Sequence, residues 1–113
     1  MTEQVKRYRS VSERLLNAVA AQCAARAAFE AARDVHDDKR VCLLLDGVPG
    51  LPAERCNAEV REAALSRALM PQILVLRTAR DNLRRADTEL EAARIAERAE
   101  REALRADLYR AAQ

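Results

Sequence analysis

The sequence has few of the residues that end helices and few of those that favour sheets. Its 113 residues include 2 glycines, 3 prolines, no tryptophan and only 3% aromatic side chains. A charged fraction of 34% with so few breaking residues indicates long helices rather than strands. The length suits one domain. We therefore expect an all-α chain that forms a single helical domain over residues 1–113.

Residues that commonly carry catalysis or bind metals are also scarce. The 3 cysteines (Cys23, Cys42, Cys56) contain no Cys-x-x-Cys pair, which argues against a disulfide framework or a zinc site and favours buried thiols in a reducing compartment. The sole histidine lies in His36-Asp37-Asp38, and consecutive helical residues point in different directions. The sequence offers no Ser-His-acid set and no glycine-rich phosphate loop. We expect no enzyme activity, no cofactor, no metal and no small-molecule substrate.

A membrane segment and a strong charge of one sign are missing as well. The N-terminus lacks the apolar core of a signal peptide. The longest apolar run outside the alanine-rich zone, residues 41–45, is far too short to span a bilayer. The 20 basic and 18 acidic residues give a net charge of +2, which is too even to predict nucleic-acid binding by itself. We expect a cytoplasmic protein without a membrane partner.

The clearest positive pattern is an alternation of leucine and alanine in the C-terminal half. The steps of three and four residues are the heptad spacing of a helix that packs lengthwise on another helix. This packing seam consists of Leu76, Ala79, Leu83, Ala86, Leu90 and Ala93.

The next two heptad positions are Glu97 and Glu100, so the seam is expected to end at Ala93. The distal end, with Tyr8 and Tyr109 near it, is then where a second subunit or another partner should bind.

Glycine and proline divide the chain into three expected helices, at about 2–45, 53–69 and 71–110, with a loop at 46–52. Gly47 suits the left-handed residue that ends a helix, and Pro52 suits the first helical position. A strand at 41–45 is the alternative, but nothing in the sequence could pair with it. Pro71 either breaks the chain between the second and third helices or kinks it, and a break is favoured because helical geometry is disfavoured before proline.

The first and third expected helices have nearly equal lengths. Folding back would lay them side by side, which predicts an antiparallel hairpin with coiled-coil-like packing and a short helix near the turn. Residues 41–45 and 73–76 are apolar on all sides. These two patches are expected to meet beneath the short helix and the loop and to form the best core of the molecule.

Two groups of basic residues are candidate nucleic-acid contacts. A bound phosphate backbone would suit them, whereas pairing within a helix, such as Arg77 with Asp81 or Glu97 with Arg101, is the alternative interpretation. The first group is Lys6, Arg7, Arg9 and Arg14, and the second is Arg77, Arg80, Arg84 and Arg85.

Asn57-x-x-x-Arg61 follows the Gly/Pro loop and places two polar residues one helical turn apart. They could brace the loop or mark a contact surface. With a long helix before it and a Pro break and charged helix after it, this motif resembles short helical proteins of phages and mobile elements. The likeness covers about residues 41–110 and implies an accessory role in recombination or replication. The sequence departs from that pattern at Leu69-Met70-Pro71, where an acidic cap before proline is usual.

Three functions remain open from the sequence. The first is a non-enzymatic interaction or adaptor protein that self-associates or docks on a protein partner through its seam. The second is an accessory nucleic-acid-binding factor for phage recombination or replication. An inhibitor or structural component of a larger assembly fits the same physical features.

Overall fold

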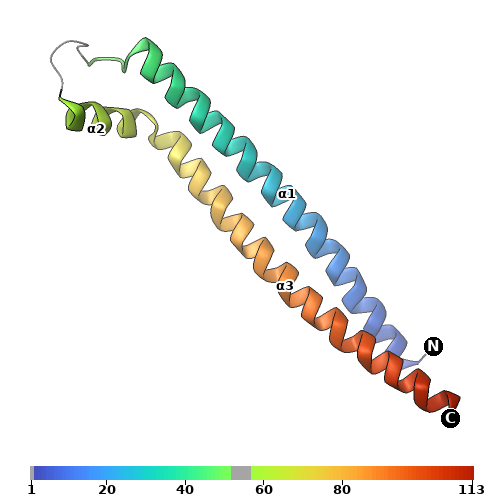
Figure 1. Ribbon diagram of the computed structural model, residues 1–113. Coiled ribbons are helices and arrows are strands. Elements are labelled where there is room, and N and C mark those ends of the chain that lie inside the picture. The colour runs from blue at the N-terminus through green and yellow to red at the C-terminus, as the bar shows by residue number, and fades with distance from the viewer. Residues whose placement is uncertain (1, 52–56) are drawn as a thin grey trace. The chain divides into compact units, whose positions relative to one another are not determined.

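The computed structural model describes residues 2–51 and 57–113. They form three helices, α1 (Glu3–Asp46), α2 (Ala58–Ala68) and α3 (Met70–Ala112), as Figure 1 shows. These described residues contain no strand, so the all-α fold class is confirmed. Residues 41–45 belong to α1, not to a strand. The expected start of the second helix near Pro52, and Cys56, lie outside the described residues.

Contacts divide the chain into two compact units, each with buried residues of its own. Unit 1 consists of residues 2–26 and 82–113, and unit 2 is Ala27–Asp81. Each unit combines one segment of α1 with one segment of α3, and unit 2 also contains α2.

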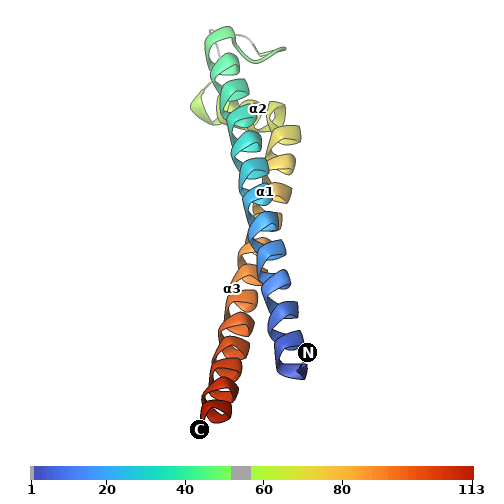
Figure 2. The same cartoon turned by 90° about the vertical axis from the view of Figure 1, so that its right-hand side faces the viewer.

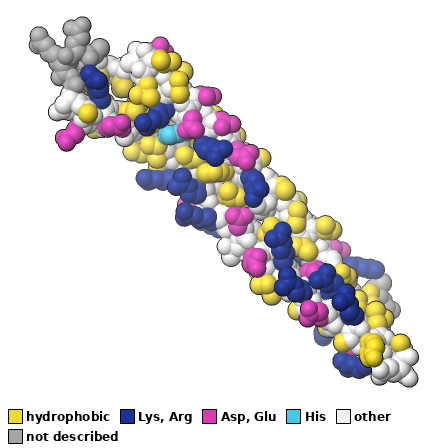
Figure 3. All heavy atoms as spheres, in the orientation of Figure 1, with side chains coloured by type: hydrophobic (Ala, Val, Ile, Leu, Met, Phe, Trp, Pro, Cys, Tyr) yellow, Lys and Arg dark blue, Asp and Glu magenta, His cyan; other side chains and the backbone are white. Residues whose placement is uncertain are grey.

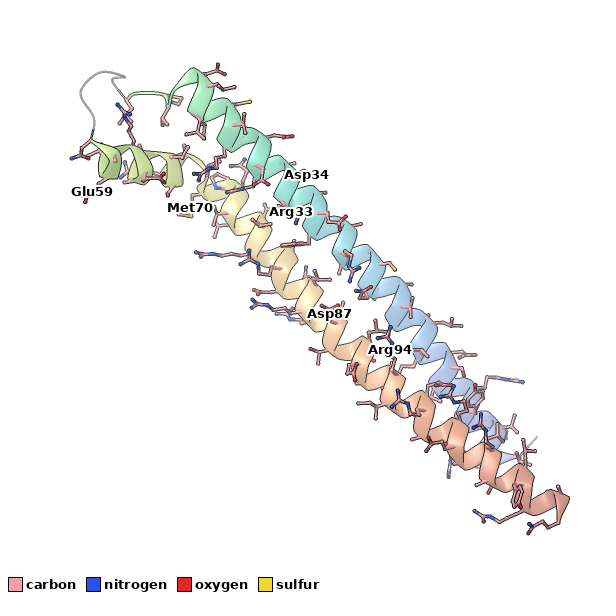
Figure 4. The ribbon with its side chains drawn as sticks, viewed as in Figure 1. Arg33, Asp34, Glu59, Met70, Asp87 and Arg94 are labelled. Carbon is pink, nitrogen blue, oxygen red and sulfur yellow. The ribbon has the colours of Figure 1, made fainter. Side chains whose placement is uncertain are left out.

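In unit 1, the beginning of α1 packs against the end of α3, near both termini (Figures 1 and 2). Ala18, Leu90 and Ala93 form the buried cluster, and Leu15 packs against it. Gln22 donates a hydrogen bond to Asp87 at 3.2 Å. Asp87, labelled in Figure 4, stands on α3.

In unit 2, the end of α1 packs against α2 and the beginning of α3. The Lys39 Nζ donates to the Gln72 Oε1 at 3.2 Å. The guanidinium of Arg80 lies 6.0 Å from the centre of the Phe29 ring. In both units, earlier residues of α1 contact later residues of α3, so the antiparallel helical hairpin is confirmed.

The burial of α1 follows a heptad. Apart from Val5 and Ser12, its buried and half-buried residues recur at steps of three and four along the helix, as in a coiled coil. The inner seam of α1 consists of Gln4, Tyr8, Val11, Leu15, Ala18, Gln22, Ala25, Phe29, Ala32, His36, Lys39 and Leu43.

The sequence predicts that the matching seam of α3 ends at Ala93, but the seam continues beyond that residue. Glu97 and Glu100 are half-buried, and so is Leu104 at the next heptad position. The Tyr8 hydroxyl donates to the Glu97 Oε1 at 3.3 Å, and the Gln4 Nε2 donates to the Glu100 Oε2 at 2.7 Å. The glutamates stay in the seam because α1 supplies hydrogen-bond donors opposite them.

Two glycines shape the end of α1 and the loop after it. Gly47 has a φ of +86° directly after the last helical residue, the left-handed conformation expected there. Pro49 and Gly50 form a turn in which the Leu51 N–H donates to the Val48 oxygen at 3.1 Å. Proline followed by a residue of positive φ, here +81° at Gly50, is the signature of a type II turn.

A single residue, Leu69, separates α2 from α3. Leu69 is 2% exposed, its N–H donates to the Leu65 oxygen at 3.0 Å, and its own oxygen accepts from the Ile73 N–H at 2.9 Å. The break therefore falls at Leu69, and α3 already begins at Met70 (Figure 4). Pro71 sits in the first turn of α3, where a missing N–H removes no helical hydrogen bond.

The expectation of a best core beside the loop was wrong. Leu44 and Leu45 of α1 and Leu74 and Val75 of α3 are exposed. Among the described residues, unit 2 buries Leu65, Leu69 and Ala79. An apolar run buries only the stripe that faces its neighbours, and these helices have too few neighbours to cover the rest. Among the described residues, none of the helices has a stretch long and apolar enough to cross a membrane.

Candidate interaction surface

Exposed apolar side chains gather in unit 2. Scattered exposed leucines are normal, but a group of them on one small unit marks an interaction surface. Figure 3 shows hydrophobic atoms reaching the surface among the charged ones on one face of the molecule. The exposed large hydrophobic residues of unit 2 are Val35, Val41, Leu44, Leu45, Val60, Met70, Leu74 and Val75.

A groove of about 380 Å³ lies between α1 and α3 within unit 2. Three alanines and Val35 form its α1 wall, and the short alanine side chains leave the space between the two helices unfilled. Gln72 is the one polar residue of its lining, and its Oε1 already accepts from Lys39. The groove is lined by Ala28, Ala31, Ala32, Val35, Pro71, Gln72 and Val75.

Unit 1 has a hollow whose lining includes an ion pair. The Arg14 Nε donates to the Glu89 Oε1 at 2.7 Å, and the Arg14 Nη2 donates to the Glu89 Oε2 at 3.2 Å. The hydrogen bond from Arg14 lowers the pKa of Glu89, and the same hydrogen bond raises the pKa of Arg14. The rest of its lining combines Ser10, Glu13 and Asn17 with Ala18 and Ala21.

A second hollow, of about 390 Å³, lies between the end of α1, the loop and α2. Arg61 and Glu62 line it together with apolar residues. Asn57 is the N-cap of α2, and its Oδ1 accepts from the Val60 N–H at 2.8 Å. Glu59, labelled in Figure 4, follows in the first turn, where its negative charge interacts favourably with the positive end of the helix dipole. The suggested contact role of Asn57 and Arg61 stays a prediction.

The first basic group is divided by the structure. Lys6, Arg7 and Arg9 are exposed on α1, whereas Arg14 is engaged by Glu89. Tyr8, which lies among them, is half-buried and directs its hydroxyl to Glu97. Its ring is therefore part of the seam rather than a free stacking surface.

The second basic group is divided as well. Arg77 and Arg80 belong to unit 2, while Arg84 and Arg85 belong to unit 1. The structure adds a residue that the sequence did not suggest, because the Arg33 guanidinium lies 5.9 Å from the same Phe29 ring that Arg80 approaches. Figure 4 labels Arg33 and its neighbour Asp34 on α1, and Arg94 on α3.

The expected pairs within helices are formed only in part. Arg101 lies 3.9 Å from Glu97, as predicted. Arg77 forms no ion pair with Asp81 in the part of the chain that the structure describes. A contact with nucleic acid by these arginines stays a prediction.

His36 belongs to the inner seam of α1. Its Nδ1 lies 2.9 Å from the Asp37 Oδ1, and its side chain is 18% exposed. Across residues 2–51 and 57–113, no three His, Cys, Asp or Glu side chains are grouped as a metal site would need.

Comparison of the chain with protein-family models, curated proteins and solved structures found no match. The apolar groove of unit 2 is the feature whose chemistry is most specific, since it combines shape, apolar lining and exposed side chains around it.

Proposed function

We propose that this chain is a non-enzymatic interaction protein that binds an α-helical protein surface through the apolar side of unit 2. One observation carries the proposal. Val35 and Val75, on opposite walls of the groove, are 57% and 60% exposed. A row of small and branched apolar side chains between two helices is the shape that a third helix fills.

The energetics favour such a partner. Covering one half-exposed Val or Leu side chain contributes roughly 1 kcal/mol. Several of these side chains together reach the lower part of the ~4–15 kcal/mol that association costs in lost freedom of motion. Burial of this surface thus offsets part of the cost of association, and further contacts with the partner must supply the remaining free energy.

A pair of matched substitutions tests the proposal. Val75→Lys places a charge in the groove, whereas Ile95→Lys makes a similar change at a 58% exposed position of α3 in unit 1. Both sites are exposed, so both variants should keep the helix content of the wild type by circular dichroism. Each protein is run in sedimentation velocity and used as bait for co-purification from its source cells.

We expect Val75→Lys to abolish self-association or the capture of a defined partner. Ile95→Lys should leave the affinity within about twofold, because a surface substitution outside the interface changes the free energy by up to about 0.5 kcal/mol. The proposal would be refuted by a wild-type protein that stays monomeric and whose captured proteins are all captured equally well by Val75→Lys.

The charge of unit 1 favours a second candidate, an accessory nucleic-acid-binding factor in phage recombination or replication. Unit 1 carries 12 basic and 9 acidic residues, whereas unit 2 carries 8 and 9. Binding would be electrostatic and steeply salt-dependent. Titration of a labelled single-stranded oligonucleotide at low salt, with Arg7→Gln/Arg9→Gln as the variant, tests it. Absent binding, or binding that added salt leaves unchanged, would exclude this candidate.

A further inference from the structure

Two arginines of unit 2 approach the same aromatic ring from opposite helices. Phe29 is half-buried in the inner seam of α1. The centre of its ring lies 5.9 Å from the Arg33 guanidinium and 6.0 Å from the Arg80 guanidinium. Arg33 stands one turn beyond Phe29 on α1, whereas Arg80 belongs to α3. Residues far apart in the chain thus bring two positive charges to one place.

The two arginines lie on the other side of the seam from the apolar groove. Arg33 and Arg80 each directly follow a buried or half-buried seam residue. Val35 and Val75, which line the groove, each directly precede one. In a heptad, the residue after position d and the residue before position a flank the seam on opposite sides. The arginine pair is therefore a surface separate from the groove.

Neither arginine forms an ion pair with a carboxylate of the described residues. By contrast, Arg40, the next residue on this side of α1, lies 4.0 Å from Glu62 of α2. Two positive charges that converge without a counter-charge repel each other. An anion bound between Arg33 and Arg80 would relieve this repulsion.

We propose that Arg33 and Arg80, held at the ring of Phe29, form a binding site for a phosphate group. A guanidinium presents a planar fork of N–H donors that matches the oxygen atoms of a phosphate. A phosphate monoester carries about −1.5 to −2 charges at neutral pH, nearly as much as the pair carries with the opposite sign. Two successive phosphodiesters of a nucleic acid supply the same charge, whereas one carboxylate supplies half of it.

The ring of Phe29 distinguishes this site from two neighbouring surface charges. Guanidinium groups are attracted to an aromatic face, so the ring restrains two long, exposed side chains close together. This restraint reduces the conformational freedom that the arginines lose when they bind a ligand. Phe29→Leu keeps an apolar side chain in the seam but removes the ring. It should weaken phosphate binding and leave the helix content unchanged by circular dichroism.

Isothermal titration calorimetry with sodium pyrophosphate at low salt tests the site. The wild type is compared with Arg33→Gln, Arg80→Gln and a control, Arg67→Gln, which removes the same charge from the last turn of α2 in the same unit. All three arginines are exposed, so each variant should keep its fold. A second series uses a single-stranded oligonucleotide, which distinguishes the nucleic-acid backbone from a small phosphate compound.

Arg33→Gln and Arg80→Gln should each weaken binding about tenfold, because each removes charged hydrogen bonds to the phosphate. Arg67→Gln should stay within about twofold. With the oligonucleotide, the double variant should reduce the slope of log affinity against log salt by about 1.4, since each phosphate contact on a single strand contributes about 0.7. Binding of pyrophosphate supports a small phosphate ligand, and binding of the oligonucleotide alone supports the nucleic-acid backbone.

Equal losses from all three substitutions, or no binding of either probe at about 50 mM salt, would overturn the site. A polyglutamate peptide serves as a third probe. If it binds more tightly than both phosphate probes and loses affinity in Arg33→Gln, the ligand is an acidic protein and the phosphate assignment is wrong.

The site and the proposed function are tested separately. Val75→Lys should leave pyrophosphate binding unchanged, because the groove lies on the other side of the seam. Arg7→Gln/Arg9→Gln should leave it unchanged as well, since those residues belong to unit 1. Loss of pyrophosphate binding in either variant would contradict a site built from Arg33 and Arg80.

Discussion

The substitution Ala93→Leu probes how closely α1 and α3 pack in unit 1. Ala93 is 0% exposed and belongs to the cluster with Ala18 and Leu90. Leucine adds three carbon atoms where the opposing helix leaves no space. Overpacking of this kind costs about 1–3 kcal/mol. The effect should be large for so small a core, since the described chain buries only 6 residues.

Ala99→Leu is the matched control. Ala99 lies in the same helix and is exposed. Alanine and leucine have similar helix propensities, so this change should stay within about 0.5 kcal/mol. The two variants differ in burial but share the same chemical change.

Urea denaturation followed by circular dichroism measures the difference. Concentrations are kept where sedimentation shows one oligomeric state, because association shifts apparent stability. We expect Ala93→Leu to unfold at lower urea than both the wild type and Ala99→Leu. Equal midpoints for the two variants, or a higher midpoint for Ala93→Leu, would refute close packing at this position.

Two further predictions concern the ion pair and the glycine at the end of α1. Because Arg14 lowers the pKa of Glu89, the pair stabilises the fold above about pH 4.3, the ordinary glutamate value, and this contribution is lost as the pH falls further. Glu89→Gln should therefore show a weaker loss of thermal stability between neutral pH and pH 3 than the wild type, while Glu102→Gln, an exposed control on α3, should follow the wild type; identical pH profiles for all three would contradict the pair. Gly47→Ala should lower the free energy of unfolding by about 1–2 kcal/mol, because the φ of +86° is strained for alanine although nothing lies within 4 Å of the added Cβ. Thermal denaturation measures this change, and an unchanged midpoint would show that the left-handed conformation is not required.

Much of the fold could be predicted because its signals are local. The leucine and alanine steps from Leu76 to Ala93 follow from helical periodicity, and Gly47 ends α1 because only glycine adopts its conformation without strain. By contrast, Glu97 and Glu100 could not be assigned to the seam from the sequence. A charged residue at a heptad position indicates the end of a seam until its partner is known. Here the partners, Tyr8 and Gln4, are about ninety residues away along the chain.

The position of the candidate site could not be predicted from the sequence either. The sequence pointed to the end of the seam near Tyr8 and Tyr109 as the place for a partner, whereas the groove lies in unit 2, between alanines of α1 and Val75 of α3. The apolar run at 41–45 suggested burial, yet Leu45 is 80% exposed. Composition cannot distinguish an apolar side chain in a core from one on an uncovered surface, since the difference depends on neighbours that are distant in sequence.

By itself, then, the sequence determined the helical class, the three helices and the antiparallel hairpin, because propensity, periodicity and glycine geometry act over a few residues. Only the tertiary structure decided which stripe of α1 is covered and which remains open. The seam that began as a run of leucines and alanines continues through hydrogen-bonded glutamates. Ala28, Val35 and Leu45 of α1 stay exposed because α3 can cover only one side of that helix.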